Sequence, residues 1–264
     1  MQLSKTISSS KNPLVKQILL LKEKSRERKK TGLFVIEGLR ELTLAQKGSY
    51  DIVSLLLCEE LFTGDPSLHI DAKSITLVTK AVYQKVAHRD STEGILAIAK
   101  TKEHHLNEIR FATKTPLILV AEAPEKPGNI GALLRTADAA NLDAVLIANP
   151  KTDLYNPNII RSSVGCVFTT QIGMGSTADI IGFLKAKKIA IYCAALTASK
   201  NYLKLDYTKA TALVVGTEST GLSSIWLNNA HHNLIIPMEG EIDSMNVSVS
   251  AAILIFEAKR QRYL

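Results

Sequence analysis

Small and polar residues collect in three segments of the sequence, each directly after a short apolar run. These segments span residues 122–138, 215–223 and 234–256. In the third, Pro237 ends the apolar run, an acidic glycine loop follows, and Ser244 and Asn246 precede a stretch with helical periodicity. The start of a helix has unpaired N–H groups and a positive dipole potential, so this segment suits an anion or a polar ligand. A plain helix cap is the alternative interpretation.

The first two segments combine glycine with single polar side chains. Gly128 and Gly131 permit a close backbone approach, and Arg135 lies in a helix start otherwise lined by leucine and alanine. Arg135 could bind a ligand or form an outward salt bridge. In the second segment Gly216 ends a buried strand, which would let a ligand lie against bare backbone. Glu218 is either a ligand group or an acceptor that stabilises the turn.

The sequence patterns of several common sites are missing. The first segment is not G-x-G-x-x-G and has no acidic residue at a convincing ribose position, which disfavours a nicotinamide cofactor. Neither a P-loop nor a G-x-S-x-G elbow occurs. The three cysteines are far apart and no H-x-x-x-H pair or His/Cys cluster is present, so we expect reduced thiols and no metal site.

Strands and helices must position these segments, and from residue 116 onward they alternate. Continuous apolar strands between helices predict an α/β fold with a mostly parallel sheet covered by helices on both faces. Ligands of such sheets bind outside the carboxyl ends of the strands, where the three segments fall. We expect strands at 117–121, 144–148, 169–172, 189–194, 212–215 and 234–236, and helices at 129–140, 157–167, 176–187, 222–230 and 246–262.

The first hundred residues show a smaller α/β pattern. The stretch 100–115 is polar and has no sustained apolar face, so we place the domain boundary there and expect domains at 1–105 and 106–264. The smaller pattern predicts a helix at 11–30, a second helix that ends at about residue 47 and a third at 81–87. It predicts strands at 34–36, 52–57, 75–78 and 94–99.

The net charge of +7 is concentrated at one end of the chain. Residues 1–48 hold 11 of the 32 basic residues and 4 of the 25 acidic ones, and the remainder of the chain is balanced at 21 each. A concentrated basic patch indicates a polyanionic partner, usually nucleic acid, although a solvated lysine-rich helix face is the alternative. The residues predicted to contact RNA are Lys11, Arg26, Arg28, Lys29, Lys30 and Arg40.

The start of the sequence is polar and lacks the apolar run of a signal peptide. No later apolar run approaches the length that spans a bilayer. We therefore expect a soluble, cytoplasmic protein without a membrane partner.

Taken together, the runs NIGALLRTADA, VVGTESTGL and IIPMEGEIDSMNVSVSAAI resemble the three motifs of the SpoU (TrmH) family of RNA ribose 2'-O-methyltransferases, within the SPOUT class. The resemblance covers residues 116–264. More loosely, SKNPLVK and FVIEG resemble the start of the family's ribosomal-protein-like substrate-binding domain. The resemblance implies S-adenosylmethionine as methyl donor, a homodimer, and a trefoil knot whose loops form the cofactor pocket.

The same resemblance assigns roles by motif position. Arg135 corresponds to the catalytic arginine of the family. The other polar motif residues of the site are Asn129, Glu218, Ser244 and Asn246, and the cofactor contacts are Gly216, Ile236, Met245, Leu196 and Met238. Met245 stands where many members have leucine, and because methionine fills the same apolar volume the pocket is not put in doubt.

No histidine lies in any motif, and arginine stays protonated in ordinary surroundings, with a pKa above about 12. We therefore expect Arg135 to bind the 2'-oxygen or a neighbouring phosphate and to lower the pKa of the hydroxyl. The leading hypothesis is 2'-O-methylation of structured RNA, with 23S ribosomal RNA as the expected substrate. The alternatives are a transfer RNA ribose methyltransferase, a non-catalytic RNA-binding protein on the same fold, and a small-molecule methyltransferase, which the basic N-terminal region disfavours.

Overall fold

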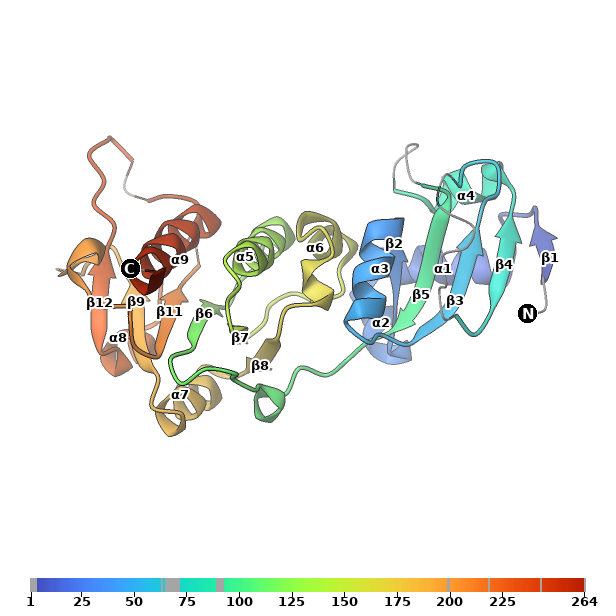
Figure 1. Ribbon diagram of the computed structural model, residues 1–264. Helices are drawn as coiled ribbons and strands as arrows, with labels where there is room; N and C mark the ends of the chain where they lie inside the picture. Colours follow the sequence, from blue (N-terminus) through green and yellow to red (C-terminus); the bar gives the residue numbers. More distant parts are fainter. Residues whose placement is uncertain are drawn as a thin grey trace. The chain divides into compact units, whose positions relative to one another are not determined.

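The structure is a computed structural model of the chain, and it describes residues 4–62, 64, 72–88, 93–198, 200–217, 219–242 and 244–263. It divides into two compact units, which are treated separately here (Figure 1). Unit 1 comprises residues 1–103 and 153–169, and unit 2 comprises 104–152 and 170–264. The predicted division, 1–105 and 106–264, placed the segment 153–169 with the second domain, whereas its contacts group it with unit 1.

Unit 2 contains a seven-stranded sheet in which every neighbouring pair of strands is parallel. The strand order is β10-β12-β9-β11-β6-β7-β8. The strands are β6 Leu117–Glu122, β7 Ala144–Ala148, β8 Ile172–Gly175, β9 Ala190–Ala194, β10 Lys200–Asn201, β11 Thr211–Val215 and β12 His232–Ile235.

Helices cover both faces of this sheet, as predicted. Helices α5 and α9 pack together on one face, and α7 and α8 pack on the other (Figure 1). Their bounds are α5 Pro127–Ala139, α7 Thr177–Ala186, α8 Ser224–Asn229 and α9 Val247–Tyr263, with 3-10 turns η1 Leu106–Glu108 and η3 Tyr202–Lys204. The fold class is therefore confirmed, while the trefoil knot stays a prediction because strand order alone does not define one.

Apolar residues from alternate strand positions make the core beneath α7 and α8. Ile118 and Val120 of β6 and Ala212 and Val214 of β11 are fully buried there, together with Trp226 of α8. Because parallel strands are covered on both faces, the intervening residues of the same strands are buried as well, against α5 and α9. The continuous apolar runs in the sequence follow from this arrangement.

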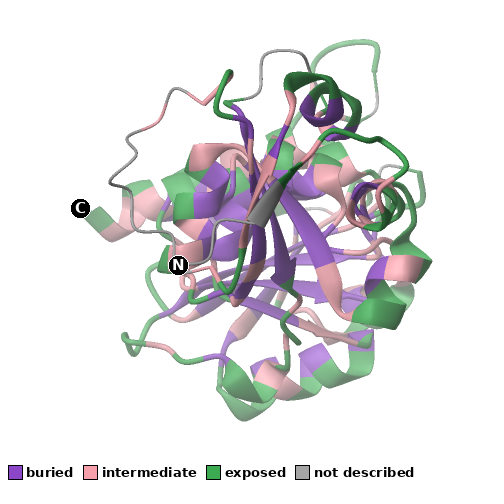
Figure 2. Cartoon of the chain, turned by 90° about the vertical axis from the view of Figure 1, so that its right-hand side faces the viewer, coloured by how far each residue is buried: buried purple, intermediate pink, exposed green. Residues whose placement is uncertain are grey.

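Unit 1 is built on a mixed five-stranded sheet in the order β1-β4-β3-β5-β2. Figure 2 shows buried central strands surrounded by exposed helix faces. The strands are β1 Ser4–Ile7, β2 Leu33–Glu37, β3 Ile52–Leu57, β4 Ile75–Val78 and β5 Ile95–Lys100, and the helices are α1 Pro13–Glu23, α2 Ser25–Thr31, α3 Leu39–Lys47, α4 Lys80–Val86 and α6 Pro157–Ser162, with the 3-10 turn η2 Cys166–Phe168.

The segment 153–169 joins unit 1 through aromatic side chains. The rings of Phe34 and Tyr155 lie 4.4 Å apart between centroids, those of Tyr50 and Phe168 lie 5.1 Å apart, and the hydroxyls of Tyr50 and Tyr155 are 3.2 Å apart. Each aromatic contact buries a large apolar area. This buried cluster explains why a segment from the middle of the chain belongs to the N-terminal unit.

Some predicted elements differ from the structure. The predicted helix 11–30 is two helices, because Lys24 has an extended backbone, with φ −113° and ψ 109°. The predicted helix 157–167 stops at Ser162, where Val164 and Gly165 adopt positive φ, and β8 begins three residues later than expected. The last strand lies at His232–Ile235 rather than 234–236, and the edge strands β1 and β10 were not predicted. Short edge strands carry too few residues for a readable period.

Candidate active site

A cavity of about 540 Å³ opens in unit 2 where β9, β11 and β12 end. Pockets for drug-sized ligands span about 300–1,000 Å³, so this volume suits one ligand of that size. None of the described side chains that line it is charged. They are Ala194, Ala195, Leu196, Thr197, Val215, Gly216, Thr217, Ser219, Thr220, Gly221, Leu222, Leu227, Leu234, Ile235, Ile236, Met238, Ser244, Met245, Val247 and Ser250.

The residues predicted to contact the cofactor come together in this cavity. Leu196 follows β9, Gly216 follows β11, and Ile236, Met238 and Met245 follow β12. Ser244, one of the predicted polar residues, lines the same cavity. Glu218 lies outside the described residues. The parallel order of the three strands positions these loops side by side, since their carboxyl ends meet at one edge.

Gly216 has a structural reason in addition to the predicted ligand contact, which stays a prediction. A Cβ atom at this position would meet the carbonyl carbon of Gly221 at 2.2 Å and its oxygen at 2.3 Å. Thr217 and Gly221 exchange two backbone hydrogen bonds of 3.1 Å, so the loop folds back directly over Gly216. Gly221 itself has φ +66°. The glycine is therefore required by the chain's own backbone, and the cavity wall at this point is a tight turn.

A buried carboxylate that the sequence analysis assigned no role holds this loop in place. Glu122, at the end of β6, is only 7% exposed. Its two oxygens accept hydrogen bonds from Ser223 N at 2.8 Å and Ser223 Oγ at 2.7 Å, and from Thr177 Oγ1 at 3.2 Å. Ser223 is the N-cap residue of α8, directly after the cavity loop. A negative charge at a helix N-terminus is favourable, so Glu122 fixes both the helix and the loop before it.

The signal for Glu122 was present in the sequence. Glutamate is almost never buried unless it is paired, and here it ends an otherwise apolar run, LILVAE. Nearby, burial first and the charge of Glu122 second raise the pKa of the Cys193 thiol to about 12. Cys193 is therefore an unreactive thiol beneath the site.

Two of the predicted polar residues are joined by a direct hydrogen bond. Asn246 Nδ2 donates to Asn129 Oδ1 at 3.1 Å and so connects the starts of α9 and α5. Asn246 Oδ1 accepts from Ser248 N at 2.9 Å and from Ser248 Oγ at 2.6 Å. These contacts cap α9 and leave the amide group of Asn246 as the donor toward α5. Asn246 thus makes the plain helix cap that the sequence left open.

Arg135 lies apart from the cavity. It is exposed on α5, six residues beyond Asn129, which corresponds to about 9 Å along the helix axis and roughly 120° around it. Arg135 does not line the cavity that holds Ser244 and Met245. Within one chain, the predicted site residues therefore form two groups, one around the cavity and one along α5.

The basic residues predicted to contact RNA are mostly on the surface of unit 1. Lys11, Arg26, Lys29, Lys30 and Arg40 are exposed.

Arg28 is a correction to that prediction, because its residue is only 2% exposed. Its Nε is paired with the carboxylate of Asp153, and its Nη1 donates to Leu21 O at 2.6 Å and to Lys22 O at 3.2 Å. Arg28 thus satisfies carbonyl groups at the end of α1 and holds the segment 153–169. The break at Lys24 turns α2 so that Arg28 faces the carbonyl groups at the end of α1, and a count of charges along the sequence does not detect this.

Two further classes of feature were searched for in the described residues. They contain no group of three or more His, Cys, Asp or Glu side chains arranged to hold a metal ion. Within that same part of the chain, none of the helices has both the length and the apolar character needed to cross a bilayer.

Comparison with known proteins gives matches along the whole chain. Residues 116–256 match the SpoU rRNA Methylase family, and residues 12–97 match the MRM3-like substrate binding domain. The chain is 31% identical over 255 residues to the 23S rRNA (guanosine(2553)-2'-O)-methyltransferase RlmP of Bacillus subtilis, covering 97% of this chain and 99% of that protein.

Solved structures agree with these sequence matches. A crystal structure of an RNA 2'-O ribose methyltransferase superimposes with a TM-score of 0.85 at 36% identity, over 98% of this chain and 100% of the other. An AdoMet-bound rRNA methyltransferase from Sinorhizobium meliloti gives a TM-score of 0.87 at 26% identity, over 97% of each chain. The fold, the cavity formed by the motif loops and the match over residues 116–256 lead to one conclusion: the chain belongs to the SpoU rRNA methylase family.

Proposed function

We propose that this protein transfers a methyl group from S-adenosylmethionine to a ribose 2'-hydroxyl of 23S ribosomal RNA. The proposal depends above all on the cavity of unit 2, where Gly216, Ile236 and Met245 from separate loops line one ligand-sized space. It is supported by relatives that align along nearly the whole chain and carry this activity in their names. The Bacillus subtilis relative and the Sinorhizobium meliloti structure are named for ribosomal RNA, which favours this substrate over transfer RNA.

The cavity fits S-adenosylmethionine in both size and lining. Leu196, Ile236 and Met245 offer apolar contacts for an adenine ring, and the turn at Gly216 and Thr217 offers backbone groups. Ser244 and Ser250 are the polar side chains toward the start of α9. The bound cofactor supplies an electrophilic methyl group on a sulfonium. The protein's remaining tasks are to position the ribose and to assist loss of its proton.

We assign the second task to Arg135. Its guanidinium would bind the 2'-oxygen or an adjacent phosphate, stabilise developing negative charge and make the hydroxyl more acidic. A planar, forked donor suits such a contact better than an ammonium. Asn129 and Asn246, joined at 3.1 Å, would orient the ribose next to it.

We also propose a homodimer. Val249, Phe256 and Tyr263 of α9 are 49%, 52% and 78% exposed, and their spacing of seven residues puts them along one side of the helix. An exposed apolar stripe of this kind marks an interaction surface, and a second copy of the chain would cover it with a self-complementary contact. In that dimer, Arg135 of one protomer would serve the cofactor cavity of the other, since it does not line its own.

Mixed dimers test this arrangement. Arg135→Ala and a cavity variant, Gly216→Val, should each be inactive alone, the second because any side chain meets the backbone of Gly221. Dimers containing one chain of each kind retain one complete site if Arg135 works across the interface, so activity should return to roughly a quarter of the wild-type value in a statistical mixture of chains. Failure of mixing to restore activity would place Arg135 and the cavity in the same protomer. Sedimentation of the wild type and of Phe256→Glu tests the dimer itself.

The activity is tested with labelled cofactor. The wild-type protein and tritiated S-adenosylmethionine are incubated separately with ribosomal and transfer RNA from cells that lack the protein, and alkali-resistant dinucleotides are mapped. Label in 23S rRNA supports the proposal, and label only in transfer RNA identifies the other substrate. Cofactor binding without transfer to either mature RNA is followed by the same assay on precursor ribosomal particles, where absence of label would contradict the proposal. Since the relatives act on bacterial ribosomal RNA, we propose a cytoplasmic location.

A further inference from the structure

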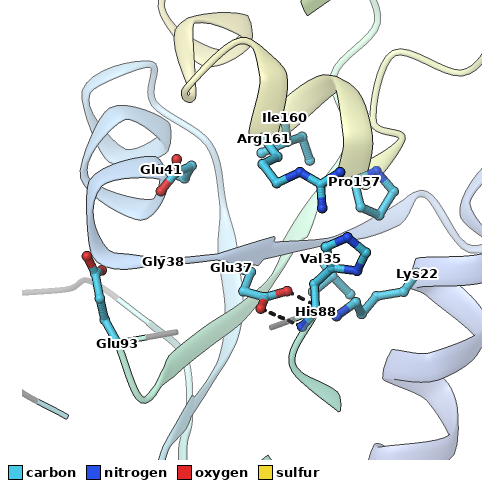
Figure 3. Close-up of a pocket in the computed structure, with 10 residues that line it drawn as sticks. All are labelled: Lys22, Val35, Glu37, Gly38, Glu41, His88, Glu93, Pro157, Ile160 and Arg161. Atoms are coloured by element: carbon cyan, nitrogen blue, oxygen red, sulfur yellow. Dashed lines mark hydrogen bonds and ion pairs between the residues drawn. The ribbon is translucent and has the colours of Figure 1, made fainter. Parts of the chain in front are cut away.

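Unit 1 contains a second, smaller pocket of about 190 Å³ between β2, α3 and α6 (Figure 3). Val35, Pro157 and Ile160 supply its apolar surface. An apolar cavity of about 150 Å³ holds one benzene ring, and drug-sized ligands need about 300 Å³ or more. The pocket is therefore the size of one planar ring system.

Carboxylates stand around this apolar surface in fixed positions. Glu37 Oε2 accepts from Lys22 Nζ at 3.0 Å, and Glu37 Oε1 accepts from the backbone N–H of His88 at 2.7 Å. Glu93 Oε2 accepts from the N–H of Leu39, at the start of α3. These two side chains are held by donors of the protein itself.

Glu41 differs from them because its second oxygen faces the glycine that lines the pocket. The residue is 9% exposed, and Oε1 accepts from Arg40 Nη2 at 3.0 Å. A Cβ atom on Gly38 would meet Glu41 Oε2 at 2.6 Å, so this oxygen lies directly over Gly38, where φ is +101°. Gly38 is also part of the pocket wall. Glu41 Oε2 is not among the described buried side-chain atoms that lack a hydrogen-bond partner, so it stays accessible to a donor from solvent or from a ligand.

We propose that this pocket binds one unstacked nucleobase of the RNA substrate, guanine in particular, with Glu41 accepting hydrogen bonds from its edge. The inference rests on the proposed function, which supplies an RNA ligand. Guanine presents two adjacent N–H donors, the ring N1–H and the 2-amino group, and a carboxylate matches that pair. Recognition of RNA sequence generally uses bases turned out of a helix, read along their edges and held against side chains.

Cations at the pocket suit the phosphates that accompany such a base. Arg161 reaches from α6 toward the side where His88 and Lys22 lie (Figure 3). The side chain of Arg40, paired with Glu41, is 63% exposed. Arg40 and Arg161 could both contact phosphate oxygens while keeping their present hydrogen bonds, to Glu41 and Asn158 respectively. The pocket thus combines an apolar slot, an accessible carboxylate acceptor and exposed cations.

Glu41→Gln separates base recognition from simple charge attraction. If the carboxylate accepts from guanine, the amide removes part of that contact, and affinity for unmethylated 23S rRNA falls roughly tenfold, the usual value of one good base contact. If this region meets only phosphate, removing a negative charge leaves affinity unchanged or raises it. A fall in affinity therefore supports base recognition, and the absence of a fall contradicts it. Lys47→Gln, also on α3 but outside the pocket, removes a positive charge and shows the effect of charge alone, which should be a slight weakening that is equal for all RNA sequences.

A second measurement obtains its main result from the wild-type protein, so that result does not depend on how Glu41→Gln folds. The wild-type protein is incubated with 23S rRNA transcripts that carry scattered inosine in place of guanosine. The positions of inosine are then mapped in the bound and unbound transcripts. Inosine lacks the 2-amino group, so one guanosine position should be depleted from the bound fraction, and Glu41→Gln should lose that discrimination. Uniform retention of inosine at every position would overturn the proposal. The same preparation of wild-type protein is also assayed for methyl transfer from tritiated S-adenosylmethionine. If it transfers the label, a negative inosine result contradicts only the base pocket and leaves the proposed function standing.

Discussion

The two pockets of this protein differ in the chemistry of their linings. The described residues that line the cavity of unit 2 are uncharged, and its shape comes from backbone turns and apolar side chains. The pocket of unit 1 is surrounded by charged side chains, including Lys22, Glu37, Glu41 and Arg161. A cofactor that is the same in every reaction can be bound by a rigid backbone shape. A polyanion with variable sequence requires cations for affinity and side-chain acceptors for selection.

The two units also contain charged residues that stabilise the fold and do not face a ligand. In unit 1 the buried pair Arg28–Asp153 fastens the segment 153–169, and in unit 2 the buried Glu122 fastens the loop that follows β11. Both are charged residues in sequence stretches that attract functional interpretation. Burial and partners decide which role each one has.

The largest effect is expected at Arg135, the motif cation outside the cavity. Arg135→Ala should lower turnover by about 10²–10³-fold, because a preorganised charge on the reacting oxygen is lost. Affinity for S-adenosylmethionine, measured by calorimetry, should stay unchanged. Arg135→Lys should also be severely impaired, since an ammonium lacks the forked geometry. A loss of cofactor affinity in these variants would contradict the comparison of the two pockets, because cofactor binding in unit 2 would then require a charged side chain. Lys187→Ala, exposed after α7, is the control.

Asp153→Ala should produce the largest loss of stability. It leaves the Arg28 guanidinium buried without its ionic partner, which costs about 3–5 kcal/mol. Urea unfolding followed by tyrosine fluorescence or circular dichroism measures the change. The matched control is Lys73→Ala, which removes an exposed pair with Asp51 and should cost far less stability, because solvent screens that pair. Equal costs for the two variants would mean that Arg28 finds another partner or water.

Glu122→Gln should weaken cofactor binding without touching the cavity itself. The amide puts an N–H₂ group among the Ser223 and Thr177 donors, and an unsatisfied buried contact costs about 1–3 kcal/mol. If half or more of this free-energy cost falls on the ordered state of the cavity loop, affinity for the cofactor falls roughly tenfold. KM for the cofactor should then rise more than kcat falls. Glu125→Gln, exposed in the following loop, should behave as the wild type. An unchanged KM would confine Glu122 to a stabilising role.

The smallest expected effect depends on pH. Ser176, through its hydroxyl first and its backbone N–H second, lowers the pKa of Asp179 in the capping box of α7. A carboxyl whose pKa is lowered in the folded state stabilises it above the unfolded pKa, about 3.9, and loses that contribution as pH falls. Asp179→Asn should therefore be slightly less stable than the wild type at pH 7, and the difference should shrink as pH falls below the unfolded pKa and through the lowered folded pKa. A difference that does not shrink over this range would assign the effect to hydrogen bonding by the uncharged side chain.

Much of unit 2 and its site could be predicted from local patterns. Apolar runs marked five of the parallel strands to within two residues, because each strand is buried on both faces. The motif residues Gly216, Ile236 and Met245 were expected in one pocket, and they line it. The break at Lys24 and the end of α6 at Ser162 were not visible, because both depend on where distant residues pack.

By itself, the sequence determined the class of fold, the three loops at the carboxyl edge of the sheet and the basic character of the first unit, since each depends on residue type and near-neighbour spacing. Tertiary structure alone decided the roles of individual residues. Arg28 is buried by a partner 125 positions away, and Glu122 accepts hydrogen bonds from residues 55 and 101 positions along the chain. Gly216 is required by the turn that places Gly221 against it. Such contacts arise from long-range packing, which no local period or charge count encodes.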